Sequence, residues 1–446
     1  MWKLISVLIL SFVLINLGYS QEKIKGYEKN WPQWRGPDAT GAALTGNPPA
    51  EWSETKNVKW KIEIPGKGHA TPIVWGDQIF VSTAVETDKT GEKKAEETKE
   101  SPRGGGMSPN KTDKICKFEV LSIDRNSGKV MWERTVAEEV PQESTHELGS
   151  WASNSSVTDG KNLYAFFGSR GLYCLDFKGN VKWERNFGQM NIVMNFGEGS
   201  SPAIYKDKVI VQWDHQGKSF IVALDKNTGK DIWKVDRDEG TSWATPIVAE
   251  LNGKAQVITS ATKLIRSYDL ETGELIWQCS GMTNNVIPCP LYSNGIVYAM
   301  SGFRGNALRA IDLAKAKGDI TNTNAIIWQY NQDTPYTPSP LIANNRLYFL
   351  KANNGSLSCL DAKDGKVNYA AEKLEGIGNI YSSPTEAGDK VYIVGEKGLT
   401  YVIRQGPQFQ VLAKNTLEDG FHASPVVIGN DLYLRGFKYL YCISQK

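Results

Sequence analysis

The sequence predicts an all-β chain of 446 residues, built from eight similar units of about four strands each. A strand start of the type Ala-Thr-Pro-Ile-Val or Ser-Ser-Pro recurs along the chain, and no helical period runs between its copies. The Pro-type positions are Pro72, Ser156, Pro202, Pro246, Pro290, Pro340, Pro384 and Pro425. Repeats of this length are typical of propeller blades or solenoids. The expected fold is an eight-bladed β-propeller of antiparallel blades.

The first three strands of a unit are recognised by their residue types. Runs such as KDKVIVQW, NGIVYAM, NNRLYFL and GDKVYIV are β-branched and aromatic, and Gly, Asn or Asp turns introduce them. The third strand ends at an Asp, and a Gly follows four residues later, as in Asp225 and Gly229 or Asp269 and Gly273. The Asp accepts hydrogen bonds from its own turn, and the Gly supplies a positive φ.

The fourth strand carries a large aromatic residue that we expect to be buried against a neighbouring sheet. This position holds Trp132, Trp183, Trp233, Trp277, Trp328 and Tyr369, and the pattern weakens near Val411. Trp60 stands alone near the N-terminus, whereas the last unit stops at YLYCISQK without a Trp strand. We therefore predict that the strand around Trp60 pairs with Leu440 to Ile443 and closes the ring, which leaves few exposed sheet edges.

These repeats, together with the segment NWPQWRGPDATG at residues 30–41, resemble the pyrroloquinoline-quinone-like β-propeller repeat family over roughly residues 30–446. That family includes quinoprotein alcohol dehydrogenases and a non-enzymatic propeller lipoprotein of the outer-membrane β-barrel assembly machinery. The dehydrogenases typically carry a disulfide between adjacent Cys, and no two Cys are adjacent here. The resemblance therefore implies the fold, while quinone chemistry is put in doubt.

The N-terminus has the pattern of a secretory signal peptide. Lys3 precedes an apolar run from Leu4 to Leu17, and small residues stand before a cleavage site after Ser20. We expect residues 1–20 to be removed, 21–54 to form a lead-in and 55–446 to form the propeller, with a charged insertion at about 86–114. The product would be periplasmic or secreted, monomeric and without a transmembrane span. Net charge is +2, so no nucleic-acid partner is expected.

The Cys residues give no clear disulfide framework. Cys174, Cys359 and Cys442 occupy a slot that holds Ser or Ala in other units, so they are predicted to be small core residues in separate blades. Cys279 and Cys289 are close enough in sequence to bridge, and this alternative stays open at this stage. Cys116 has no assigned partner.

Long connections are expected on one face of the ring, at Glu133 to Ser153, at Glu184 to Gly199 and in the insertion, whereas the Asp-Gly turns occupy the other face. Three residues before each Pro-type position a ring of side chains would surround the channel mouth. Ring closure makes His69 and His422 neighbours there. The predicted ligand-binding residues are His69, Trp151, Glu198, Trp243, Tyr336, Tyr381 and His422. Arg237 and Glu239 are expected to form surface ion pairs.

Two roles are considered for the channel-mouth residues. They bind a ligand, or they only plug the channel and satisfy backbone groups. The preferred hypothesis is a non-catalytic binding or scaffold protein that holds a protein, peptide or glycan on its long-loop face. The alternative is a pyrroloquinoline-quinone-dependent oxidoreductase, similar to an alcohol dehydrogenase, with calcium or another divalent cation at the channel mouth. No catalytic residues and no metal ligands are predicted.

Overall fold

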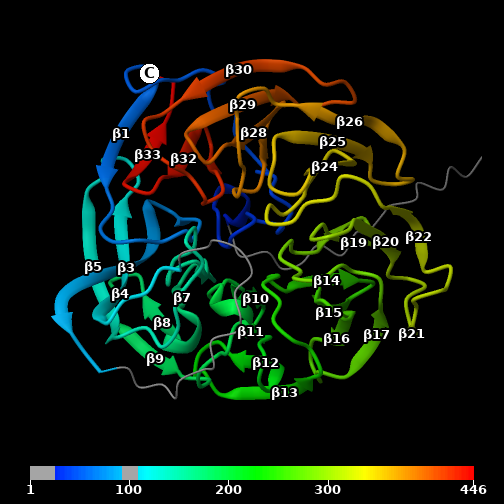
Figure 1. Cartoon of the computed structure of the whole chain (residues 1–446), viewed down its shortest axis with the longest axis horizontal. Helices are drawn as coiled ribbons and strands as arrows, with labels where there is room; N and C mark the ends of the chain where they lie inside the picture. The colour runs from blue at the N-terminus through cyan, green and yellow to red at the C-terminus, as the bar shows by residue number, and fades with distance from the viewer. Residues whose placement is uncertain (1–25, 93–108, 446) are drawn as a thin grey trace, which may run out of the picture.

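The computed structural model describes residues 26–92 and 109–445, which form eight sheets around a central channel (Figure 1). Seven sheets contain four strands and one contains five. The predicted eight-bladed propeller is confirmed. Three short 3-10 helices also occur, η1 (Tyr27–Lys29), η2 (Gly168–Arg170) and η3 (Val193–Asn195). In residues 26–92 and 109–445 no helix has the length and apolar character needed to cross a membrane. The predicted signal peptide lies outside the described residues.

The blades are numbered here in chain order. Blade 1 contains β2 (Ile73–Trp75), β3 (Gln78–Thr90), β4 (Lys114–Asp124) and β5 (Val130–Glu139). Blade 2 contains β6 (Val157–Thr158), β7 (Asn162–Phe166), β8 (Leu172–Asp176) and β9 (Val181–Arg185). Blade 3 contains β10 (Ala203–Tyr205), β11 (Lys208–Trp213), β12 (Ser219–Asp225) and β13 (Asp231–Arg237). Blade 4 contains β14 (Ile247–Leu251), β15 (Lys254–Thr259), β16 (Ile265–Asp269), β17 (Leu275–Cys279) and the added β21 (Gly318–Asp319).

The second half of the ring follows the same plan. Blade 5 contains β18 (Leu291–Ser293), β19 (Ile296–Ser301), β20 (Ala307–Asp312) and β22 (Ile326–Tyr330). Blade 6 contains β23 (Leu341–Ala343), β24 (Arg346–Leu350), β25 (Ser356–Asp361) and β26 (Val367–Lys373). Blade 7 contains β27 (Thr385–Ala387), β28 (Lys390–Val394), β29 (Leu399–Arg404) and β30 (Val411–Thr416). Blade 8 contains β31 (Val426–Ile428), β32 (Asp431–Arg435), β33 (Tyr439–Ile443) and, from the N-terminal end, β1 (Val58–Glu63).

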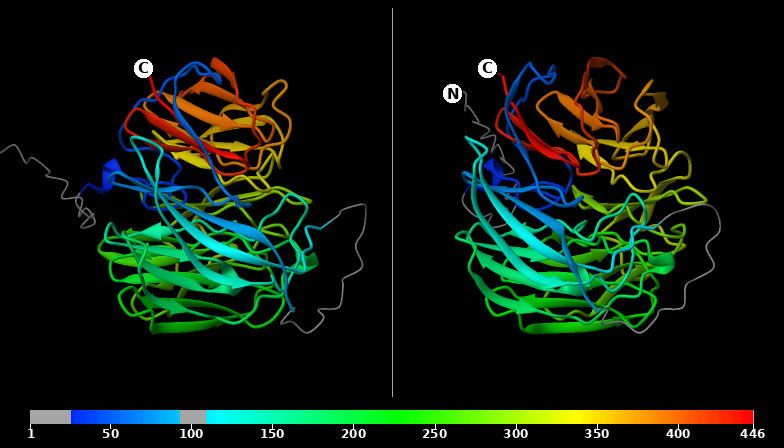
Figure 2. Two further views of the ribbon diagram at one scale, coloured as in Figure 1. Left: turned by 90° about the vertical axis from the view of Figure 1, so that its left-hand side faces the viewer. Right: turned by 60° about the vertical axis from the view of Figure 1, so that its left-hand side comes forward.

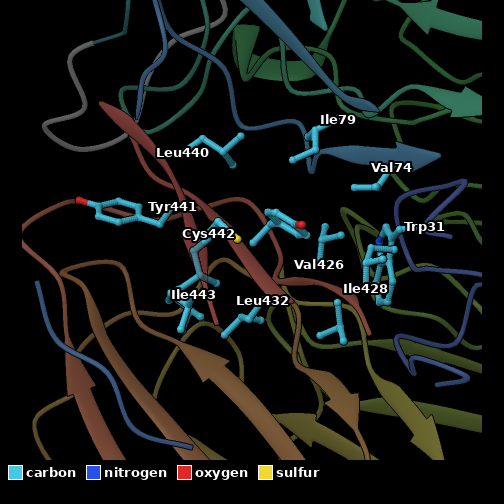
Figure 3. Close-up of a cluster of buried hydrophobic side chains, with 14 of the residues drawn as sticks. Trp31, Val74, Ile79, Val426, Ile428, Leu432, Leu440, Tyr441, Cys442 and Ile443 are labelled. Atoms are coloured by element: carbon cyan, nitrogen blue, oxygen red, sulfur yellow. The ribbon is translucent and has the colours of Figure 1, made fainter. Parts of the chain in front are cut away.

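Blade 8 closes the ring as predicted. β1 pairs antiparallel with β33, with Trp60 opposite Cys442 and Ile62 opposite Leu440. In the side views the blue N-terminal strand lies beside the red C-terminal strands (Figure 2). The core of this blade packs Cys442 and Ile443 together with residues of β2 and β3 such as Val74 and Ile79 (Figure 3). The ends of the chain are therefore joined by one continuous apolar core.

The repeated Trp and Gly meet at the seams between blades. The indole N–H of each Trp donates to a backbone carbonyl in the Asp-Gly turn of the next blade, at 2.9–3.2 Å; the pairs are Trp60 with Arg125, Trp132 with Phe177, Trp183 with Lys226, Trp233 with Leu270 and Trp328 with Ala362. At Gly229, where φ is 70°, an added Cβ would lie 2.6 Å from the Trp183 ring. Gly is needed there for the close approach as well as for the turn.

The seam between blades 4 and 5 departs from this pattern. Blade 5 has no Asp-Gly turn, and its third and fourth strands are joined by a longer connection that contains β21. β21 pairs in parallel with β17, with Gly318 opposite Trp277. The Trp277 indole is fully buried and donates to Gln256 of its own blade at 3.2 Å. The longer connection therefore covers Trp277, whereas in the other seams the Trp packs on an Asp-Gly turn and donates to it.

A belt of hydrogen bonds links the inner strands around the channel. The residue just before each Pro-type position carries a hydroxyl, except in blade 5, and its backbone N–H donates to the hydroxyl of the next blade. The bonds measure 2.9–3.1 Å and run from Thr71 to Ser155, Ser155 to Ser201, Ser201 to Thr245, Cys289 to Ser339, Ser339 to Ser383, Ser383 to Ser424 and Ser424 to Thr71. Cys289 stands where the eighth hydroxyl would be. This arrangement, which we name the hydroxyl belt, explains the Ser and Thr of the repeated motif.

Two sequence boundaries need correction. The inner strands begin after the Pro-type position, as β2 does at Ile73, because the residues before it bond to the next blade rather than to their own hairpin. The insertion also starts later than predicted. β3 and β4 continue pairing through Glu86 with Cys116 and on to Thr90 with Lys114.

The lead-in is part of the propeller rather than a separate segment. Residues 30–43 enter the channel and lie at the centre of the ring, in dark blue in Figure 1. Arg35 is buried there, and its Nη2 donates to the carbonyls of Pro340 at 3.0 Å and Pro384 at 2.9 Å. Trp31 is fully buried against blade 1. The lead-in thus ties together inner strands from both halves of the ring.

Candidate functional site

The mouth of the channel on the long-loop face brings His69 and His422 together, as ring closure predicts. Their ring centroids are 4.6 Å apart, and Tyr381 lies 4.6 Å from His422 on the other side. Phe437, from the loop between β32 and β33, packs on both imidazoles at 4.8 and 5.6 Å. The pair lies in an aromatic cluster that joins blades 7, 8 and 1.

Burial controls the charge of this cluster. It lowers the pKa of His69 well below the ordinary value of 6.5, and the neighbouring His422 and Arg435 lower it further, although the backbone of Leu148 and Gly149 acts in the opposite direction. Burial also lowers the pKa of His422, which Glu396 opposes from 3.4 Å. The His422 side chain is only 6% exposed. Both imidazoles are therefore neutral at pH 7, and each presents one donor and one acceptor.

The other predicted residues lie on the same face with different partners. The Trp243 indole donates to the carbonyl of Gly197 at 2.7 Å, and the Trp151 indole donates to the backbone carbonyl of Glu143 at 2.9 Å. Tyr336 stacks on Phe303 at 4.8 Å. Glu198 is not beside the His pair, because its carboxylate accepts from the backbone of Ser169 at 2.8 Å in blade 2. These contacts link loops of the long-loop face to one another and, through Glu198, to blade 2.

A buried polar network fastens the two longest connections to each other. The Glu143 carboxylate accepts from the backbone N–H of Ile192 at 3.2 Å, and Arg170 contacts Glu198 at 3.4 Å and Glu139 at 3.4 Å. Burial raises the pKa of Glu143 to about 7, with a smaller contribution from Glu198. The connection 140–156 is therefore fixed over the mouth.

Three Phe residues of this face were missed in the sequence analysis. Phe196 lies 6.5 Å from Trp243, Phe303 stacks on Tyr336, and Phe437 is 42% exposed beside the His pair. A sequence signal for two of them exists, because Gly-Phe followed by Arg or Lys occurs at 302–304 and again at 436–438. The long-loop mouth is thus surrounded by partly exposed aromatic side chains, which we name the aromatic rim: Trp151, Phe196, Trp243, Phe303, Tyr336, Tyr381 and Phe437.

The prediction of surface ion pairs at Arg237 and Glu239 was wrong. Arg237 pairs with Asp214 at 2.7 Å, and both side chains are fully buried. Glu239 is also buried and pairs with Arg266 at 2.5 Å. The acidic partner of Arg237 comes from the loop after β11, so nothing adjacent in the sequence indicates the burial.

The residues at the long-loop mouth do not fit pyrroloquinoline quinone with a divalent cation. A planar tricarboxylate needs a flat slot and cationic partners, but the rings of His69, His422, Tyr381 and Phe437 fill the space with one another. Calcium prefers several oxygen ligands, and within the described residues no group of three or more His, Cys, Asp or Glu comes together. All six Cys are buried free thiols, so the bridge between Cys279 and Cys289 does not form.

The opposite mouth, on the face of the short turns, contains a cavity of about 630 Å³. The lead-in forms one wall through Tyr27, Gln33 and Pro37 to Thr40, and the inner hairpins of blades 2 to 5 form the rest. Ion pairs line it in part, including Lys226 with Asp159 at 3.0 Å. Its size lies within the range of small-molecule and peptide pockets. The repeat pattern of the sequence did not indicate this cavity.

Comparisons with known proteins agree with the repeat analysis. The sequence model of the family described as outer membrane protein assembly factor BamB matches residues 50–198, 116–280 and 217–446. The protein of that name from Francisella tularensis subsp. tularensis is 24% identical over 225 residues, which cover 44% of this chain and 45% of the relative. The one from Yersinia pestis is 22% identical over 331 residues, with coverages of 63% and 79%. The chain thus spans about half the length of the first relative and most of the second.

Solved structures show the same fold at low sequence identity. BamB from Moraxella catarrhalis superposes with a TM-score of 0.52 at 15% identity, covering 82% of this chain and 98% of that one. A europium-containing methanol dehydrogenase superposes with a TM-score of 0.62 at 12% identity, covering 93% and 91%. At these identities the likeness concerns the fold alone. Because the family model covers the chain from residue 50 to residue 446, the chain belongs to the family of outer membrane protein assembly factor BamB.

Proposed function

We propose that this chain is an exported, non-catalytic propeller that acts as a periplasmic scaffold in outer membrane protein assembly. Its long-loop face would be the surface that contacts polypeptide partners. The observation that carries the proposal is the aromatic rim, because a cluster of partly exposed aromatic side chains on a rigid surface is typical of protein interfaces. The descriptions of the two relatives support the biological process.

The rim is suited to binding rather than to chemistry. Its side chains are fixed by contacts such as the indole of Trp243 with Gly197 at 2.7 Å and the stack of Phe303 on Tyr336. Preorganised aromatic groups lose little conformational entropy when a partner docks. The buried, neutral His pair supports the rim from below, since both imidazoles pack on Phe437 and His422 also packs on Tyr381.

The proposal is tested by deletion of the gene and complementation in the native host. Loss of the protein should reduce the amount of folded β-barrel proteins in the outer membrane, measured by heat-modifiable migration on gels. The double variant Phe303→Ala with Phe437→Ala should complement poorly, since it removes two rim anchors. The matched control is Met131→Ala with Leu275→Ala, which removes two more exposed apolar side chains from outer strands.

If the rim variant complements at the wild-type level and the control fails, the proposed contact surface is wrong. The oxidoreductase alternative is favoured only by the fold shared with the methanol dehydrogenase. Titration with the quinone and calcium, followed by absorbance and thermal shift, distinguishes the two. We expect no saturable change, and dye-linked alcohol oxidation would reverse the order of the hypotheses.

A further inference from the structure

The innermost strand of every propeller blade has one edge that faces the channel. In each inner strand the second residue after the Pro-type position is a non-hydrogen-bonded partner within its own hairpin, so its N–H and C=O point into the channel. These channel-facing positions are Val74, Thr158, Ile204, Val248, Tyr292, Ile342, Glu386 and Val427. Backbone groups of this kind need a partner when they are buried.

The lead-in supplies that partner in four blades. Trp31 exchanges two backbone hydrogen bonds of 2.9 Å with Val74 in blade 1, and the next residue, Pro32, accepts from Thr158 in blade 2 at 2.9 Å. Farther along, Thr40 accepts from Ile342 in blade 6 at 3.1 Å.

The following residue continues this pattern in blade 7, where Gly41 accepts from Glu386 at 3.0 Å. An extended chain therefore crosses from one blade to the next with about one residue per blade.

Blades 3, 4 and 5 receive no such bond. The same holds for Val427 of blade 8 among the described residues, but this residue is buried and does not line the cavity. Between Pro32 and Thr40 the lead-in folds back on itself, with Gly36 donating to Gln33 at 2.9 Å and Ala39 donating to Gly36 at 3.2 Å. No backbone hydrogen bond within the described residues reaches the channel side of Ile204, Val248 or Tyr292. These three positions line the turn-face cavity. They are half-buried, whereas the four covered counterparts are fully buried.

The side chains of the cavity do not select for one sign of charge. Lys206 and Lys226 face Asp38, Asp159 and Glu250, and the Glu250 carboxylate also accepts from Tyr205. Apolar area comes from Ile204, Ile247 and Val248. The feature common to the whole wall is the row of open backbone groups on three neighbouring strands.

We propose that the turn-face cavity binds an extended peptide segment of a partner, which pairs its backbone with β10, β14 and β18. The peptide would bridge the gap that the lead-in leaves between blades 2 and 6, because the cavity is continuous with the lead-in interface on both sides. Three consecutive peptide residues would reach blades 3, 4 and 5, with apolar side chains packed on Ile204 and Val248. The site is on the opposite face from the aromatic rim and does not depend on the function proposed for that rim.

The test uses the full-length protein after export and a fluorescein-labelled peptide Val-Thr-Val-Thr-Val with blocked ends, measured by fluorescence anisotropy. Saturable binding is expected. The analogue with N-methylated backbone amides keeps the side chains and loses the donors, so it should bind at least about tenfold more weakly. Equal binding of the two peptides would overturn the proposal, as would no saturable binding of the first.

Protein variants locate the site. Val248→Pro removes one open N–H from an edge strand without breaking the pairing to β15, and it should lower the affinity about tenfold. Ser293→Trp fills the cavity from β18 and should abolish binding. Val427→Pro is the matched control, since it makes the same change at the same position of blade 8, outside the cavity. Melting temperatures report whether each variant is folded. Wild-type affinity in folded Val248→Pro and Ser293→Trp proteins would place the peptide elsewhere and overturn the proposal.

Discussion

The two mouths of the central channel are closed by different means. At the long-loop mouth, side chains fill the opening, with His69, His422, Tyr381 and Phe437 packed ring against ring. At the turn-face mouth, the backbone of the lead-in covers inner strands of four blades and leaves a cavity of about 630 Å³ over three others. The hydroxyl belt lies on the inner strands between them.

This difference shows that the blades of a repeat protein can differ in two ways. The long-loop mouth attracts attention in the sequence because its residues differ from blade to blade. The turn-face mouth has short, similar turns in most blades, yet its blades are not equivalent, because a segment from outside the repeats covers some of them and not others. Side-chain variety and backbone availability are thus two separate sources of function on one scaffold.

Both mouths exist only while the ring is closed, and the largest predicted effect comes from opening it. Deletion of residues 55–64 removes β1 and uncovers the β33 edge and the turn at Gly128 on which Trp60 packs. The loss should exceed about 5 kcal/mol, since burial of a Trp alone contributes 3–5 kcal/mol. Urea unfolding measures it. A control deletion within residues 93–108 leaves β1 to β33 in place and should cost far less, so equal losses would contradict closure by β1.

The long-loop mouth should lose stability in acid. The pKa values of His69 and His422 lie below 6.5 in the folded protein, so the unfolded chain binds more protons as the pH falls through this range. The stabilisation is complete above about pH 6.5 and decreases towards pH 5. The double variant His69→Gln with His422→Gln should therefore show a smaller drop in melting temperature between pH 7 and pH 5 than the wild type. If the melting temperatures of the two proteins fall equally with pH, the two His do not contribute to the pH dependence of stability.

The turn-face mouth should respond to pH with the opposite sign. Burial raises the pKa of Glu386, in β27 beside the lead-in, from 4.5 to about 7. The folded protein then binds more protons than the unfolded chain between these values, so stability falls as the pH rises through this window. Glu386→Gln stays neutral and should be more stable than wild type at pH 8, by about 1–3 kcal/mol, with no gain at pH 4. Urea unfolding at both pH values measures this, and a gain of equal size at pH 4 would exclude titration as its cause.

The smallest effect is expected at the hydroxyl belt between the mouths. Cys289 occupies the one position of the belt without a hydroxyl, and it accepts no hydrogen bond from Thr245. Cys289→Ser would offer an oxygen to that backbone N–H and should stabilise the protein by about 0.5–1 kcal/mol. Thermal unfolding under reducing conditions measures the gain. Ser339→Ala serves as the comparison, since it removes an existing link and should destabilise.

Much of the fold was determined by the sequence alone. The Asp, Gly and Trp recur at fixed distances because, except at Trp277, the Trp packs on a Gly of the next blade, so the interaction between blades repeats with the local pattern. Closure could also be predicted, because Trp60 lacks a turn and the last unit lacks a Trp. The contact between His69 and His422 follows from closure and from their equal distance to a Pro.

Other features depended on the tertiary structure. The charges around Arg237 look like a surface pattern, and only the position of Asp214 shows that the pair is buried. The path of the lead-in is set by Arg35 and Trp31, which find their partners in distant blades. The lead-in then determines which inner strands keep unpaired backbone groups at the channel. Because backbone groups are alike in nearly all residues, the sequence of the inner strands does not reveal this. A repeat specifies its contacts with the next repeat, but a segment outside the repeats is placed only by the completed ring.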